Sequence, residues 1–106
     1  MRSNYKNITQ KIKKTVTEID SSAEVILFGS RARGDAKKDS DWDILILVDK
    51  PKVTFKDEKI FWHKLYDVEL ETEQCISTLV YAKKEWETKQ SVTPLYKSVK
   101  QEGIRL

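Results

Sequence analysis

A chain of 106 residues, 39% hydrophobic and 35% charged, has the length and apolar content of one domain, which we expect to span residues 1–106. Its longest aliphatic run, Ile44 to Val48, is far shorter than the roughly 20 residues of a membrane span, no secretory signal is evident, and one cysteine excludes an internal disulfide. We therefore expect a cytoplasmic protein without a membrane partner. The net charge of +3 is the sum of two basic ends and an acidic centre. The chain has no block of five or six like charges, which is the pattern that would favour a nucleic-acid partner.

The first half of the chain predicts one helix and two strands. Apolar residues at helical spacing indicate an amphipathic helix that buries Ile8, Ile12, Val16 and Ile19. Residues 25–28 read as a short buried strand that stops at Gly29, and the polar residues 31–40 read as a loop with at most a turn or two of helix. Residues 42–48 predict a second buried strand.

The second half predicts two more helices and a third strand. Thr54 and Asp57 have the spacing of a capping box and introduce a helix over about 55–73. β-branched residues indicate a strand over 76–81, followed by a turn or short helix. The last helix has Thr93 as its cap and Pro94 at its first position, and Gly103 is expected to end it in a left-handed conformation. The fold class is α/β, with a small mixed sheet packed against helices.

Two short motifs combine into a candidate site. Gly29 and Ser30 end the first predicted strand, where a glycine allows a phosphate to approach the backbone and a serine adds a hydroxyl. Asp41 and Asp43 begin the second strand, and their Cα atoms are expected on one face roughly 7 Å apart. Two carboxylates this close repel each other unless a cation lies between them, and Mg²⁺ is held by such ligands together with substrate phosphates. We interpret the aspartates as metal ligands.

This block resembles the nucleotidyltransferase superfamily of DNA polymerase beta. The run from Gly29 to Asp35, followed by Ser40-Asp41-Trp42-Asp43, is similar to its minimal branch, the MNT type, which includes antitoxin partners of HEPN proteins. The resemblance implies a single-domain nucleotidyltransferase fold and Mg²⁺-assisted transfer of a nucleoside monophosphate from a nucleoside triphosphate, with ATP favoured, to a hydroxyl. It also implies that Gly29 and Ser30 hold the triphosphate and that Asp41 and Asp43 are the catalytic residues, which hold one or two metal ions.

The arginines of the loop, Arg31 and Arg33, are candidates for nucleotide binding because a guanidinium matches the geometry of a phosphate. Other residues are given structural interpretations. We expect Cys75 to be a small buried residue, and the three tryptophans, Trp42, Trp62 and Trp86, to be packing residues.

One departure from the family leaves two functions open. The resemblance implies a third carboxylate on a later strand, but residues 75–81 contain no acid, and Ser77 is the residue expected at that position. Glu69, Glu71 and Glu73 lie just upstream as alternative sources. The first interpretation is an enzyme that modifies an acceptor, such as a partner protein. The second is a non-catalytic antitoxin-like protein that binds a HEPN-type partner.

Overall fold

A computed structural model describes residues 2–106, with side chains from residue 5 onward. Its strands form a mixed sheet in the order β3-β2-β1-β4, in which β2 pairs in parallel with β3 and β1 pairs antiparallel with β2 and β4. The strands are β1 (Glu24–Phe28), β2 (Trp42–Val48), β3 (Ile76–Ala82) and β4 (Ile104–Arg105). The helices are α1 (Arg2–Ile19), α2 (Ser30–Arg33), α3 (Phe55–Thr72), α4 (Lys83–Thr88), the 3₁₀ turn η1 (Gln90–Val92) and α5 (Pro94–Glu102).

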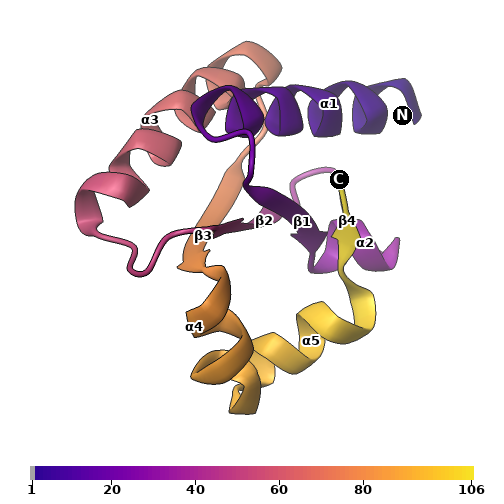
Figure 1. Ribbon diagram of the computed structural model, residues 1–106. Coiled ribbons are helices and arrows are strands. Elements are labelled where there is room, and N and C mark those ends of the chain that lie inside the picture. Colours follow the sequence, from indigo (N-terminus) through magenta and orange to yellow (C-terminus); the bar gives the residue numbers. More distant parts are fainter. Residues whose placement is uncertain (1) are drawn as a thin grey trace.

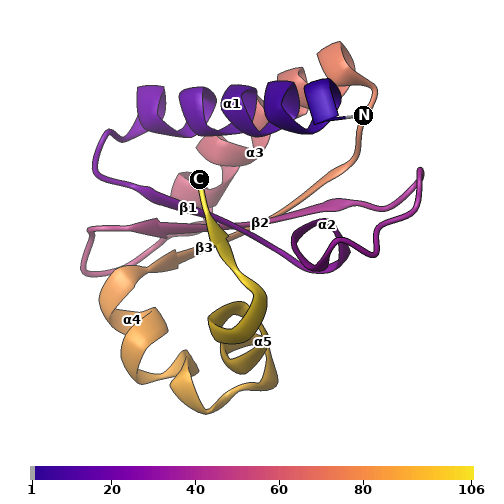
Figure 2. The same cartoon turned by 90° about the vertical axis from the view of Figure 1, so that its right-hand side faces the viewer.

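Helices cover both faces of the sheet. Figure 2 shows α1 and α3 on one side of the strands and α4 and α5 on the other, with α2 at the end of β1. In Figure 1 the short strand β4 follows α5 and returns the chain to the edge of β1. The predicted α/β class with a small mixed sheet is therefore confirmed.

Alternating side chains on β2 build a separate core on each face. Trp42 and Ile44 are buried in the cluster that includes the apolar stripes of α1 and α3, whereas Leu45 and Leu47 are buried with Trp86 on the other face. This alternation follows from the pleat of the strand, which sends successive side chains to opposite faces. Asp43 consequently shares a face with Leu45 and Leu47, on the side of α4 and α5.

The predicted helices and long strands are confirmed with small shifts of their ends, and the capping signals are confirmed in detail. The Thr54 hydroxyl accepts from the Asp57 backbone N–H, and the Asp57 carboxylate accepts from the Thr54 backbone N–H, which completes the capping box of α3. Thr93 caps α5 by accepting from the Tyr96 N–H, and Pro94 occupies the first turn.

The prediction for Gly103 is wrong. Its φ of −62° and ψ of 137° are extended, because the chain continues directly into β4. The glycine is needed for close packing instead. A Cβ atom there would lie 2.4 Å from the Val99 carbonyl oxygen and 2.9 Å from Ile26 Cγ2, so its absence lets the end of α5 approach β1.

One expectation about burial is also wrong. Cys75 is exposed, because it lies in the connection before β3 and not within the sheet. Trp62 packs edge-on against the ring of Phe55 on the outer side of α3, where it remains 39% exposed. Trp42 and Trp86 are buried as expected. Among the described residues, no helix is long and apolar enough to cross a membrane.

Candidate nucleotide site

The turn between β1 and α2 places the backbone of Gly29 directly against a carboxylate. Gly29 has a φ of 74°, a left-handed value that favours glycine. Phe28 pairs with Asp43 across the β1–β2 ladder, so the turn leaves β1 beside that residue. A Cβ atom at position 29 would lie 2.1 Å from Asp43 Oδ2. The predicted pair of motifs is therefore in contact, and only a residue without a side chain fits between them.

The two aspartates differ in their surroundings. Asp43 lies half-buried on β2, whereas Asp41 is exposed directly before the strand. Burial raises the pKa of the Asp43 carboxyl above its ordinary value, and the negative charge of Asp41 raises that pKa further. The positive charge of Arg33 opposes the shift. The like-charge repulsion that the sequence predicted is therefore present, and it raises the pKa of Asp43.

Ser77 lies beside Asp43 in the sheet. The parallel register of β2 and β3 pairs these two residues, and Ser77 is exposed. Residues paired across a ladder share a face, so a carboxylate at position 77 would lie next to that of Asp43. The family resemblance implied a third acid at this position.

The three upstream glutamates are engaged elsewhere. Glu69 accepts a hydrogen bond from the Ile76 N–H at 2.7 Å and so fixes the start of β3. Glu71 pairs with Lys11 of α1. Glu73 ends α3 in a left-handed conformation. None of these contacts brings a glutamate to Asp43.

Another glutamate, which the sequence did not single out, does reach the turn. Glu102 at the end of α5 accepts through Oε2 from the Gly29 N–H at 2.7 Å and from Arg33 Nη1 at 3.0 Å. Its charge also contributes to the raised pKa of Asp43. One local feature of the sequence could have pointed to Glu102. An acid in the last turn of a helix faces the negative end of the helix dipole and needs a compensating partner.

The two candidate arginines have different surroundings. The Arg31 guanidinium lies over the Trp42 ring at 4.6 Å and donates to the carbonyl oxygens of Ser40 and Lys38, so it braces the loop before β2. Arg33 pairs with Asp35 as well as Glu102 and acts electrostatically on Asp43. The structure thus brings Arg33 to the predicted site and engages Arg31 in the neighbouring loop.

The donor chemistry of the aspartates fits Mg²⁺. Two acidic side chains next to an accessible turn match the way this ion is commonly held, through one or two carboxylates and the oxygens of a phosphate ligand. Within residues 2–106, no group of three or more His, Cys, Asp and Glu side chains is arranged to hold a metal ion. A magnesium ion here would accordingly depend on Asp41, Asp43 and oxygens of its nucleotide.

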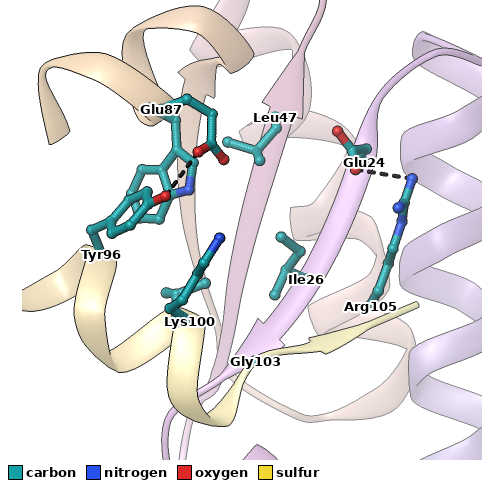
Figure 3. Close-up of a pocket in the computed structure, with 10 residues that line it drawn as sticks. Glu24, Ile26, Leu47, Glu87, Tyr96, Lys100, Gly103 and Arg105 are labelled. Atoms are coloured by element: carbon teal, nitrogen blue, oxygen red, sulfur yellow. Dashed lines mark hydrogen bonds and ion pairs between the residues drawn. The ribbon is translucent and has the colours of Figure 1, made fainter. Parts of the chain in front are cut away.

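A cavity of about 230 Å³ lies on the same face of the sheet, at the other end of β1 and β2. Figure 3 shows it between α5 and the strands, with Lys100 pointing into it, Glu24 paired with Arg105, and Glu87 bonded to Tyr96. The β1–β2 register separates the two locations: Glu24 pairs with Leu47 at the cavity, whereas Phe28 pairs with Asp43 at the turn. None of the predicted site residues lines this cavity.

Comparisons with known proteins identify the family of the chain. Residues 9–106 match the model of the nucleotidyltransferase domain. The "Putative protein adenylyltransferase MJ0141" of Methanocaldococcus jannaschii is 38% identical over 78 residues, which cover 72% of this chain and 78% of that protein.

Two solved structures share the fold. One is described as a toxin-antitoxin with AMP-PNP; it has a TM-score of 0.66 and 18% identity over 91% of this chain and 69% of that chain. The other is a mutant of the toxin-antitoxin MntA-HpeT, with a TM-score of 0.65 and 19% identity over 92% of this chain and 70% of that chain. The family match and the identity to the archaeal relative confirm the resemblance seen in the sequence, and the chain belongs to the nucleotidyltransferase domain family.

Proposed function

We propose that residues 1–106 act as one Mg²⁺-dependent nucleotidyltransferase domain that transfers a nucleoside monophosphate from a nucleoside triphosphate to a hydroxyl of a partner protein. The observation that carries this proposal is the contact between the Gly29 turn and Asp43, with Asp41 beside it. The archaeal relative bears the name of a protein adenylyltransferase, and one structural neighbour was crystallised with AMP-PNP. Both facts favour ATP as the nucleotide.

Each residue of the site has a part in this proposal. Gly29 lets the triphosphate tail approach the turn closely, the Ser30 hydroxyl binds it, and Arg33 supplies a positive charge beside them. Asp41 and Asp43 would hold Mg²⁺, which when bound neutralises charge that develops on the reacting phosphate oxygens. Their carboxylates thereby also fix the triphosphate relative to the sheet.

The transfer forms one bond and breaks another at the α-phosphorus. The acceptor hydroxyl oxygen bonds to that phosphorus while the bond to the bridging oxygen breaks, and pyrophosphate leaves with the electron pair. The proton of the hydroxyl passes to solvent water, and a carboxylate beside the acceptor would speed this proton transfer. Ser77, which lies beside Asp43, is no base at neutral pH, so a carboxylate is lacking at this position.

That observation favours a second candidate function: a non-catalytic antitoxin-like protein that binds a HEPN-type partner. Ser77 in place of an acid would leave nucleotide binding intact while weakening transfer. An exposed apolar stripe on α3, consisting of Phe55, Trp62, Tyr66 and Leu70, offers a surface for such a partner. The two candidates thus share a partner and differ in chemistry.

Intact mass spectrometry separates the two candidates. The protein is incubated with a co-expressed HEPN-type partner, ATP and Mg²⁺, and the first candidate predicts that the partner gains the mass of one adenylyl group. The variant Asp43→Asn should abolish this gain. If the wild-type protein gives no adduct although it binds ATP, while Ser77→Asp gives one, the missing carboxylate limits transfer and the second candidate holds.

A further inference from the structure

One oxygen atom joins the end of the chain to the candidate nucleotide site. Glu102 Oε2 accepts from the Gly29 N–H and from Arg33 Nη1, so a residue of α5 bonds both to the backbone of the turn and to the arginine above it. The Glu102 side chain is only 18% exposed. A hydrogen bond to a charged acceptor in partly buried surroundings is stronger than one between neutral groups.

The approach of α5 keeps Glu102 in this place. Gly103 lets the end of the helix approach Ile26 of β1 closely, and Ile104 then pairs with Leu27 of the same strand. The helix end is consequently fixed beside the strand from which the Gly29 turn leaves. Glu102 is a rigidly presented carboxylate.

Arg33 has a second acidic partner besides Glu102, and the two partners lie in different parts of the fold. Its Nε donates to Asp35 Oδ2 at 3.2 Å, and Asp35 lies in the exposed loop after α2. The bond to Glu102 therefore holds the guanidinium toward Gly29 and Asp43, whereas Asp35 alone would hold it toward the loop.

We propose that Glu102 is a positioning residue of the nucleotide site, which holds the Gly29 turn and the Arg33 guanidinium where they meet the triphosphate. This inference rests on the proposed function, because it assigns Glu102 its role toward the same ligand. It differs from a role as a resident anion, in which the carboxylate would compete with phosphate for these donors. The two roles predict opposite changes of nucleotide affinity when the carboxylate is removed.

Two variants and a control test the proposal. Glu102→Ala removes both hydrogen bonds, whereas Glu102→Gln retains an oxygen that accepts from Gly29 but loses the charge that holds Arg33. The control is Glu87→Ala, which removes another glutamate contact of α5, the bond from the Tyr96 hydroxyl at 2.8 Å. Two quantities are measured: amide hydrogen exchange of residues 29–34 without ligand, and the Kd for ATP with Mg²⁺.

We expect Glu102→Ala to speed exchange at Gly29 and to weaken ATP binding by about ten- to a hundredfold, the loss that corresponds to a hydrogen bond with a charged group. Glu102→Gln should largely retain protection at Gly29 and lose affinity by a smaller factor. Glu87→Ala should change neither quantity. This graded order separates positioning of the site from general loosening of α5.

The two measurements also separate failure of this inference from failure of the proposed function. Unchanged exchange at Gly29 in Glu102→Ala overturns the inference, as does an ATP affinity that is equal to or tighter than that of the wild type. If the wild-type protein binds no ATP, the proposed function fails. Faster exchange in Glu102→Ala would then still support the positioning of the turn.

Discussion

Gly29 and Gly34 both have a positive φ, but they differ in ψ and in their surroundings: Gly29 has a ψ of −160°, in a region essentially restricted to glycine, whereas Gly34 has a ψ of 12°, in the left-handed helical region. At Gly34, with a φ of 83°, an added Cβ meets no atom within 4 Å. Gly34→Ala should therefore cost only the backbone strain, about 1 to 2 kcal/mol. Gly29→Ala meets both the strain of a backbone conformation that favours glycine and a collision with Asp43, and it should cost roughly 3 kcal/mol or more. Urea unfolding of both variants gives the comparison.

The double variant Gly29→Ala with Asp43→Ala measures how much of the difference comes from the collision with Asp43. Because the colliding atom belongs to the Asp43 carboxylate, shortening that side chain should recover part of the stability lost in Gly29→Ala. Equal losses for Gly29→Ala and Gly34→Ala would contradict the close approach on which the site depends.

Asp43 is predicted to destabilise the ligand-free fold at neutral pH. Its raised pKa means that the folded state favours the protonated carboxyl more than the unfolded state does, so stability falls as pH rises from the unfolded pKa through the folded one. Asp43→Asn should therefore be more stable than the wild type at pH 7, and the difference should shrink toward about pH 4. Thermal melts across this range test the sign.

The same variant should lose the stabilisation that ATP and Mg²⁺ give the wild type. A ligand that binds only the folded state raises its stability by mass action, and Asp43→Asn removes one of the two carboxylates proposed to hold the ion. A ligand-induced rise in Tm that is the same in wild type and Asp43→Asn would place the metal elsewhere.

The sequence predicted those helices and strands whose positions are determined by local patterns of residues. Periodic apolar residues and capping signals located α1, α3 and α5, and short β-branched runs located β1, β2 and β3. The two-residue strand β4 has no periodicity of its own and forms because α5 delivers Ile104 and Arg105 to the edge of β1. Local patterns therefore determine where an element forms, and tertiary packing determines where its ends lead.

The residues of the candidate site also divide into those that local patterns reveal and those that only tertiary packing brings into place. The Gly29 turn and the Asp41–Asp43 pair were visible because their residues are close in sequence and adjacent strands bring them together. Glu102 was missed because its partner Gly29 is distant along the chain and the contact requires the packing of α5. The position of Ser77 was predicted from the family resemblance and agrees with the observed register.

The start of α3 provides a prediction that is independent of function. The pKa of Asp57 is lowered to about 2, chiefly by the hydrogen bond from Lys50 and then by the backbone and side chain of Thr54. Its contribution to stability is complete above the ordinary value near 4 and is lost as pH falls through about 2. Asp57→Asn should thus be less stable than wild type at pH 7, with a difference that vanishes in acid.

Thr54→Ala supplies the matching change on the other half of the capping box. It should cost about 1 kcal/mol at neutral pH through loss of the cap. If Asp57→Asn differs from the wild type equally at pH 7 and pH 2 in chemical unfolding, the ionised capping box is not the cause.

The whole molecule presents two different helical layers. On the α4 and α5 side, the helices cover the face that carries Asp43, and they supply Glu102 to the site. On the other side, α3 packs Phe61, Leu65 and Val68 inward and still presents apolar residues to solvent. The nucleotide site and this apolar stripe therefore lie on opposite layers, so a partner bound along α3 leaves α5 uncovered.

The apolar stripe of α3 consists of Phe55, Trp62, Tyr66 and Leu70 at helical steps of seven, four and four. Tyr66 and Leu70 are 56% and 62% exposed, so a charge at either position should leave the fold intact. Buried apolar and aromatic residues contribute most of the affinity of protein interfaces. We expect Tyr66→Glu and Leu70→Glu to weaken binding of the proposed HEPN-type partner at least tenfold in calorimetric titration.

Val92→Glu is the matched control for these variants. Val92 is an apolar residue that is 80% exposed, and it lies in η1 on the side of α4 and α5. The same change of charge there should leave partner affinity unaltered, because the α3 stripe and η1 lie on opposite sides of the sheet. The reverse result, with Val92→Glu weakening binding while the α3 variants bind normally, would place the partner over α4 and α5. It would then lie on the same side of the sheet as Glu102.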